Sequence, residues 1–383
     1  MILMRRGLWL LAALVLLASC SSNEEKKALE PLPLVEFENT VEVDRLWSTG
    51  LGGQAKKLYV TTTLGIADQT AYTADKDGVV YAVNLENGKV LWKRKTGLDL
   101  APSASVQNGQ VYFGGYNGLV IALSAEDGSE LWRGEVTSEV IAAPQSNGSE
   151  VAVSSIDGSL TVFDASTGNK MWTYGHVVPP LTHRGLASPI VTSTQVIAAF
   201  DNGQILAFNA NDGSSLWETR VAQPTGRHDL ERIIDIDGTP LQNGGFLYAA
   251  TFQGALAAIA RAQGRIVWKQ DISTAQPLAF ANRRVFATAA DGTVLAYNAN
   301  TGAEEWKNDK MLRRGVGAPA ILGDYVAVID ADGYMHLLSQ ETGEFAARIS
   351  AKGKRFLSAP VSHEDKLLVL ANNGTLSAYT LAD

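Results

Sequence analysis

Residues 101–136 read APSASVQNGQVYFGGYNGLVIALSAEDGSELWRGEV, and this stretch is one copy of a unit that recurs along the chain. Short runs rich in Val, Ile, Leu, Tyr and Phe alternate with Asn-Gly and Asp-Gly dipeptides, a pattern typical of strands joined by tight turns. Pro102 stands near the start, where a residue without a backbone N–H suits the beginning or the edge of a strand. The unit therefore predicts four short antiparallel strands in a meander.

The spacing inside the unit does not change from copy to copy. A turn glycine is followed ten residues later by a second glycine, and a tryptophan stands four residues after that. The first glycines are Gly78, Gly118, Gly158, Gly203, Gly254, Gly292 and Gly333, and the second are Gly88, Gly128, Gly168, Gly213, Gly264, Gly302 and Gly343. The tryptophans are Trp92, Trp132, Trp172, Trp217, Trp268 and Trp306, whereas the seventh copy has Ala347. Four strands per unit at a period near 40 residues are typical of propeller blades.

The two ends of the repeat complete each other. Gly374 opens an eighth unit, but no second glycine or tryptophan follows it, while residues 41–47 (VEVDRLW) carry the unmatched Trp47. We therefore predict an all-β fold over residues 41–383, an eight-bladed β-propeller of four-stranded antiparallel blades. Pairing of the N- and C-terminal strands would close it. A solenoid of strand–helix repeats is the alternative, and the chain lacks the helical periodicity that it needs.

Composition narrows the functional classes. The chain has 383 residues, is 46% apolar, and carries 32 Lys+Arg against 40 Asp+Glu, so it buries a sizeable core and is acidic. An acidic balance argues against a nucleic-acid partner, which needs a basic face. The single Cys excludes a disulfide framework, a cysteine-based zinc site and an iron–sulfur cluster.

The N-terminus predicts export and lipid attachment. Arg5 and Arg6 precede an apolar run over residues 7–18, which is too short to span a bilayer and suits a signal peptide. The end of the run, LASC at residues 17–20, resembles a bacterial lipobox. We expect residues 1–19 to be a lipoprotein signal peptide, Cys20 to be lipidated, and residues 20–40 to be a flexible tether reaching roughly 66–72 Å. With Ser21 after the cysteine, the resemblance implies the periplasmic face of the outer membrane.

The tryptophan segments resemble the docking motif of the quinoprotein (PQQ-dependent) dehydrogenase propellers, as in residues 82–92, AVNLENGKVLW. The resemblance implies that each indole lies between neighbouring blades, so we interpret Trp47, Trp92, Trp132, Trp172, Trp217, Trp268 and Trp306 as structural. A quinoprotein dehydrogenase is the alternative function. Such enzymes typically carry two adjacent cysteines and long loops with calcium ligands, and the sequence has neither the cysteines nor the length.

Other catalytic and metal sites are not indicated. The five histidines show no metal-ligand spacing, and no G-x-S-x-G or phosphate-binding glycine loop occurs. The turn acids, such as Asp77 and Asp127, precede glycine, a position at which turn geometry favours Asp. Calcium binding by these carboxylates is the alternative interpretation. We expect no catalytic residues, no cofactor and no metal.

Two consecutive repeats carry insertions after their tryptophans, at residues 173–188 and 218–239, and neighbouring blades would place both on one face. Together with the lipobox, the acidic tether and the eight repeats, these loops make the chain similar to the BamB family of the outer-membrane β-barrel assembly machinery. The resemblance implies a scaffold that binds the periplasmic POTRA domains of BamA, with nascent outer-membrane proteins as a further candidate partner. Family motifs map onto PPLTHRG at residues 179–185 and DIDGTP at residues 235–240. They imply partner-binding roles for Leu181, His183, Arg184, Asp235 and Asp237, with His183 in place of the usual Leu.

Overall fold

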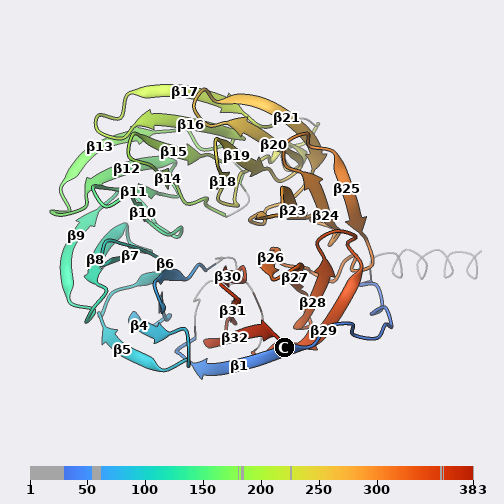
Figure 1. Cartoon of the computed structure of the whole chain (residues 1–383). Helices are drawn as coiled ribbons and strands as arrows, with labels where there is room; N and C mark the ends of the chain where they lie inside the picture. The colour runs from blue at the N-terminus through green and yellow to red at the C-terminus, as the bar shows by residue number, and fades with distance from the viewer. Residues whose placement is uncertain are drawn as a thin grey trace, which may run out of the picture.

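A computed structural model describes residues 30–53, 62–179, 181–182, 185–224, 227–353, 356 and 358–382. It contains eight four-stranded antiparallel sheets arranged as blades around a central axis, so the predicted eight-bladed propeller is confirmed (Figure 1). Besides the strands, the described residues form one short 3₁₀ helix, η1 (Asp229–Arg232). None of the described helical segments has the length and apolar character to cross a bilayer.

In each blade the sheet order runs from an innermost strand, short in all blades except the second, to an outermost strand at the rim. The innermost strands are β2 (Gly65–Ala67), β6 (Leu100–Gln107), β10 (Gln145–Ser146), β14 (Ile190–Val191), β18 (Leu241–Asn243), β22 (Ala279–Ala281), β26 (Ala320–Leu322) and β30 (Val361–His363). The second strands are β3 (Thr70–Ala74), β7 (Gln110–Gly115), β11 (Glu150–Ser154), β15 (Gln195–Ala199), β19 (Phe246–Ala250), β23 (Arg284–Thr288), β27 (Tyr325–Ile329) and β31 (Lys366–Leu370).

The outer half of each blade is built in the same order. The third strands are β4 (Val79–Asn84), β8 (Leu119–Ser124), β12 (Ser159–Asp164), β16 (Gln204–Asn209), β20 (Gly254–Ala260), β24 (Val294–Asn298), β28 (Tyr334–Ser339) and β32 (Thr375–Leu381). The rim strands are β5 (Val90–Lys95), β9 (Glu130–Glu135), β13 (Lys170–Gly175), β17 (Ser215–Arg220), β21 (Arg265–Ile272), β25 (Glu304–Asn308), β29 (Phe345–Ser350) and β1 (Val43–Gly50). We number the blades one to eight from β2–β5 onward.

The eighth blade is shared between the two ends of the chain. β30, β31 and β32 supply three strands and β1 the fourth, with Val43 opposite Leu381 and Gly50 opposite Thr375. The predicted closure by terminal strands is therefore confirmed. Because the ring has no open seam, opening it requires breaking a ladder of strand hydrogen bonds.

An indole lies across most seams between blades. Trp132 of blade two donates its Nε1–H to the Ala165 carbonyl of blade three at 2.8 Å, and its ring lies on Gly168. Gly168 has a φ of 70°, and an added Cβ would stand 2.6 Å from the indole, so glycine is needed there. The corresponding indole-to-carbonyl bonds join Trp47 to Leu85, Trp92 to Ala125, Trp172 to Ala210, Trp268 to Ala299 and Trp306 to Gln340.

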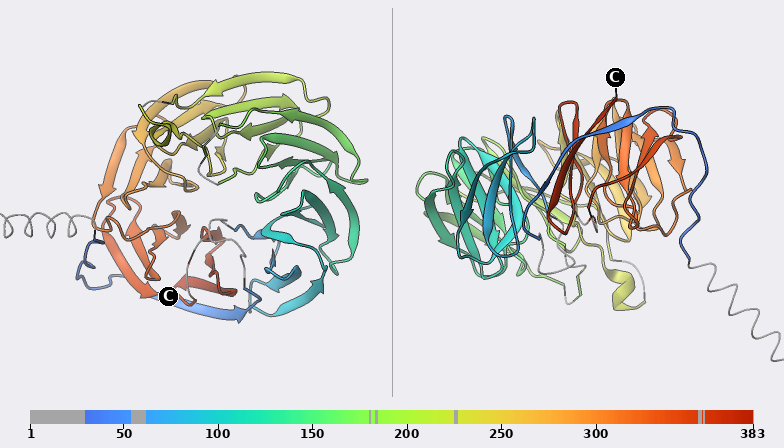
Figure 2. Two further views of the ribbon diagram at one scale, coloured as in Figure 1. Left: turned by 180° about the vertical axis from the view of Figure 1, so that it is seen from behind. Right: turned by 90° about the horizontal axis from the view of Figure 1, so that it is seen from below.

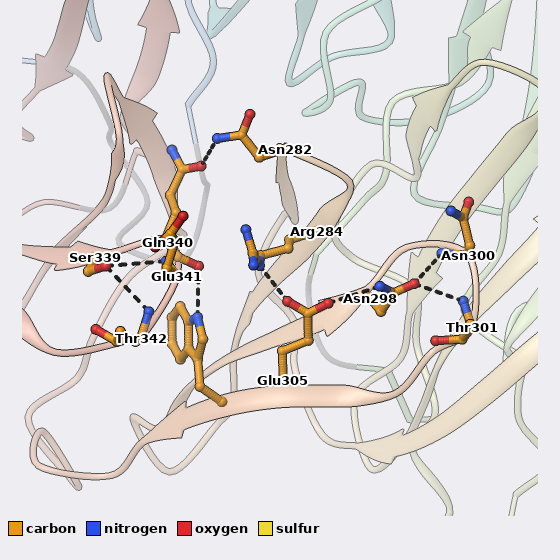
Figure 3. A network of polar contacts seen from close by, with 11 residues as sticks. Asn282, Arg284, Asn298, Asn300, Thr301, Glu305, Ser339, Gln340, Glu341 and Thr342 are labelled. Atoms are coloured by element: carbon orange, nitrogen blue, oxygen red, sulfur yellow. Dashed lines mark hydrogen bonds and ion pairs between the residues drawn. The ribbon is translucent and has the colours of Figure 1, made fainter.

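Figure 3 shows how polar groups complete one such seam, between blades six and seven. Gln340, whose carbonyl accepts the Trp306 indole N–H, also receives a 2.8 Å hydrogen bond from the side chain of Asn282. Beside it, Arg284 pairs with Glu305, and Glu305 accepts from Asn298 at 2.9 Å. The seam therefore combines the indole contact with a side-chain hydrogen bond between the blades, and the Arg284–Glu305–Asn298 network lies beside it within blade six.

Two seams depart from this arrangement. Trp217 lies on Gly264 like the other indoles, but its buried Nε1–H has no acceptor among the described residues. Between blades seven and eight the tryptophan position is Ala347, which is fully buried against Leu367 and Tyr379. There Val41, just before β1, and Val43, the first residue of β1, pack against the same cluster.

The indole bonds predict unequal effects of removing the N–H. Trp132→Phe leaves the buried Ala165 carbonyl without its donor, whereas Trp217→Phe removes an N–H that has no acceptor among the described residues. We expect Trp132→Phe to lower the free energy of unfolding by about 1–3 kcal/mol more than Trp217→Phe does, as measured by urea unfolding followed by circular dichroism. Equal losses in the two variants would contradict a role for the indole hydrogen bond.

Candidate protein-binding face

Two long connections lie on one face of the ring. The first, residues 176–189, joins β13 to β14, and the second, residues 221–240, joins β17 to β18 and contains η1. Figure 2 shows the segment around η1 projecting from the face opposite to the C-terminus. We call residues 176–189 the first connection and residues 221–240 the second connection.

The two connections are joined to each other. The Ser188 amide donates to the Thr239 hydroxyl at 3.0 Å, and Gly185 lies so close to Asp237 that a Cβ there would overlap the carboxylate. The face is therefore one composite surface. Its parts are held in register by the backbone of the first connection packing against the Thr239 and Asp237 side chains of the second.

The second connection is anchored in the core on either side of its acidic residues. Ile234 and Ile236 are 2% and 1% exposed, and Ile236 packs with Ala187 of the first connection. Asp235 lies between them and is itself fully buried, while its carbonyl accepts from the Phe252 amide at 2.9 Å. The second connection thus places Asp235 inside the protein and Asp237 at the edge of the surface.

The connections border a hollow of about 270 Å³, which contains both apolar and charged groups. Its lining residues are Pro179, Leu181, Asp201, Asn202, Pro224, Arg232 and Ile234. η1 is attached to blade five, because Gln253 donates to the Leu230 carbonyl at 3.2 Å. At its start, Glu231 accepts from the Arg227 amide at 2.7 Å.

Asp201 has a strongly perturbed carboxyl on this face. Burial, and secondarily the nearby charge of Asp237, raise the pKa of Asp201 to about 7. Beneath the first connection, burial lowers the pKa of His176, whose ring packs on Phe200 with centroids 4.6 Å apart. Burial therefore favours the uncharged form of both groups.

Large apolar side chains project from both connections. Val177 is 87% exposed, Leu230 69% and Leu181 45%. Exposed aliphatic groups beside charged ones, on a support that cannot rearrange freely, are typical of protein-contact surfaces. Val177 and Leu230 were not among the sequence-predicted site residues, although an aliphatic residue inside a polar insertion was a visible signal.

The structure brings three of the five predicted partner-binding residues to this face, namely Leu181, Asp235 and Asp237. His183 and Arg184 lie outside the described residues. Burial of Asp235 limits it to an indirect role, since a partner cannot reach its carboxylate.

Within the described part of the chain, no cluster of three or more His, Cys, Asp or Glu side chains could hold a metal ion.

The turn acids bond to their own turns. Asp127 accepts from the Ser129 amide at 2.9 Å, and Asp212 accepts from the Ser214 amide at the same distance. These are the backbone contacts expected of Asp in a tight turn, and they account for the repeated carboxylates without a ligand.

The fold defines a class of protein, a closed propeller of quinoprotein-like repeats, here with two long connections on one face. The profile of the family described as "Outer membrane protein assembly factor BamB" matches residues 76–308 and 290–383. The protein of that name from Pseudomonas aeruginosa is 42% identical over 377 residues, 97% of this chain and 99% of the relative. The Escherichia coli K12 protein of that name is 29% identical, covering 97% of each chain.

Solved structures agree with the sequence comparison. The crystal structure of BamB from Moraxella catarrhalis matches with a TM-score of 0.81 and 25% identity, over 88% of this chain and all of that one. A quinohemoprotein alcohol dehydrogenase from Comamonas testosteroni matches with a TM-score of 0.69 at 15% identity, over 89% of this chain and 77% of that one, which shows a shared fold alone. The chain belongs to the BamB family of outer membrane protein assembly factors.

Membership of this family decides between the two functions considered from the sequence. The relatives are named as assembly factors, and the dehydrogenase shares the propeller at only 15% identity. The assembly-factor interpretation is supported over the dehydrogenase alternative. Family membership associates the chain with outer-membrane protein assembly.

The contact between the connections predicts that Gly185 cannot carry a side chain. Gly185→Ala would push the first connection away from Asp237, so we expect faster amide hydrogen exchange over residues 185–188. Gly175→Ala is the matched control, because a Cβ at Gly175 meets nothing within 4 Å. Unchanged exchange in Gly185→Ala would contradict the close packing of the two connections.

The perturbed carboxyl predicts a pH dependence of stability. Because the pKa of Asp201 is about 7 in the folded state, against an ordinary value of 3.8, the folded state binds this proton more tightly than the unfolded chain does. The stabilisation is complete below the unfolded pKa and is lost as pH rises through about 7. We expect the urea midpoint of the wild type to fall across this window more steeply than that of Asp201→Asn. Asp157→Asn, an exposed turn acid of blade three, is the control and should keep the wild-type slope.

Proposed function

We propose that this protein is a non-catalytic, lipid-anchored subunit of the outer-membrane β-barrel assembly complex. In this role it binds the periplasmic POTRA domains of BamA through the first and second connections, and so assists the folding and insertion of outer-membrane proteins. The observation that carries the proposal is the composite face, where Val177, Leu181 and Leu230 are exposed and Leu181 lines a hollow together with Arg232. Family membership supplies the partner.

The exposed aliphatic groups would provide most of the binding free energy. Burying one Leu or Val side chain contributes about 1.5–3 kcal/mol. Arg232 lines the hollow and Asp237 is half-buried on the second connection, and charge-assisted hydrogen bonds from these groups would fix the orientation of the partner. Asp235 would act from inside, by holding the second connection in place. A rigid support reduces the entropy lost on association.

The remaining parts of the proposal concern the membrane and the substrate. Residues 1–19 would direct export and be removed, Cys20 would carry the lipid, and the propeller would lie on the periplasmic side of the outer membrane. Nascent outer-membrane proteins are a second candidate partner. These could pair with exposed strand edges at the rim.

Alanine substitutions on the proposed surface test the partner assignment. We expect Leu181→Ala and Arg184→Ala each to reduce co-purification of BamA from detergent-solubilised membranes, because each removes a side chain implied to contact the partner. Leu216→Ala is the matched control: Leu216 is 47% exposed and Leu181 45%, but Leu216 lies on the rim strand β17. Co-purification that is unchanged in both site variants, or lost equally in the control, would overturn the site.

A further inference from the structure

Residues 30–42 lie against blade seven, and we call this segment the strap. At its upper end the Thr40 amide donates to the Ala346 carbonyl of β29 at 2.8 Å. The Asn39 side chain accepts from the Arg348 amide at 3.0 Å. The strap therefore covers the outer edge of this rim strand. The sequence-based expectation placed a flexible tether up to residue 40, but among the described residues contacts with the propeller are already present at Glu30.

The middle of the strap is held by an aromatic contact. The ring of Phe37 stacks on Phe345 at 5.1 Å with an interplanar angle of 18°, and the Arg348 guanidinium lies 4.8 Å from the Phe37 centroid. Arg348 is oriented by the buried His336, whose Nδ1 accepts from it at 3.3 Å. Stacking and cation–π contacts of this kind hold the aromatic ring in one orientation on the rim.

The lower end of the strap is bound through its backbone by the connection between blades six and seven. The Leu32 amide donates to the Leu312 carbonyl, and the Leu32 carbonyl accepts from Arg314, both at 3.0 Å. The Glu30 carbonyl accepts from Arg313 at 2.7 Å. Pro31 and Pro33 flank this point and favour an extended backbone before docking, which lowers the entropy cost.

Arg314 is fixed by the propeller independently of the strap. Its side chain is 6% exposed and pairs with Asp330 at 2.8 Å and Asp332 at 2.6 Å. His336 also contacts Asp330, at 3.2 Å. The donor that holds Leu32 is thus positioned by the core of blade seven, so the strap has a defined docking position.

The meander fixes the face at which the strap ends. Within every blade, strands alternate in direction, so all connections from a rim strand to the next innermost strand lie on one face. The connection 309–319, which holds Leu32, belongs to this set together with the first and second connections. Figure 2 shows the strap (blue) descending along the rim to that side, away from the C-terminus.

We infer that the docked strap turns the face with the first and second connections toward the bilayer. This inference rests on the proposed lipidation of Cys20. Residues 20–30 can span at most about 33–36 Å, roughly half of the reach of a tether that continued to residue 40. The lipid would therefore hold the face near blades six and seven within that distance of the membrane surface.

This limit defines the space available to a partner. A folded domain of about 100 residues has a radius of gyration of about 13 Å, which corresponds to a sphere roughly 34 Å across. One such domain fits between the face and the bilayer, and two stacked domains do not. The anchor and the binding surface would then enclose a single layer of periplasmic domains from opposite sides.

Energy transfer from the propeller to vesicles tests this orientation. Cys20 is the only cysteine, so a cysteine added to the lipidated protein is its only free thiol. Ala331→Cys and Glu341→Cys place a fluorophore at exposed positions at opposite ends of β28, on the connection face and on the other face of blade seven. With acceptor lipid in phosphatidylethanolamine–phosphatidylglycerol vesicles, we expect severalfold greater transfer from the label at 331.

Releasing the strap provides the decisive comparison. In Leu32→Pro/Phe37→Ala/Asn39→Ala/Arg313→Ala, which removes hydrogen-bond donors at the lower end as well as the contacts above it, hydrogen exchange over residues 30–42 should rise and the difference between the two labels should shrink. Glu38→Ala, an exposed position, should leave both unchanged. Equal transfer from both labels in the wild type, or a difference that survives release of the strap, would overturn the inference. Vesicle flotation and BamA co-purification separately report failure of lipidation or of the partner assignment.

Discussion

The contact between an indole and a glycine backbone sets the separation of neighbouring blades. A side chain on the glycine would push the blades apart, and a smaller residue in place of the indole would leave the seam underfilled. The two residues belong to different blades but hold fixed places in the repeat, so every blade except seven and eight supplies one half of two such contacts. Apolar clusters of the core bridge neighbouring blades, and stability is distributed around the ring.

The closed ring supports two long connections whose sequences do not follow the repeat. The first and second connections begin and end on strands whose positions are already fixed by the seams on either side. Ile234 and Ile236 then fasten the second connection to the core, and the contact of Gly185 with Asp237 fastens the two connections together. Because the connections are anchored in this way, aliphatic side chains such as Leu181 can stay exposed without folding back onto the propeller.

The fold was predictable because it depends on periodic residues. Fixed spacing of Gly168 and Trp132 and their equivalents is visible in one sequence, and so is the unmatched Trp47 that indicates closure. Docking of the strap was not predictable, because Leu32 and Glu30 are held through backbone carbonyls that any residue possesses. Burial of Asp235 was also missed, since a D-x-D pattern does not say which acid faces inward until the flanking isoleucines are placed.

Closure by the two ends has a consequence for the order of folding. Val43 pairs with Leu381, so the first strand made is completed by the last. During synthesis β1 has no partner until nearly the whole polypeptide has emerged, and contacts between distant positions form slowly because long loops must close first. Until then the backbone hydrogen-bonding groups of β1 that pair with β32 are unsatisfied, which exposes the nascent chain to aggregation. In a chain truncated near the C-terminus, this edge of β1 would stay unpaired.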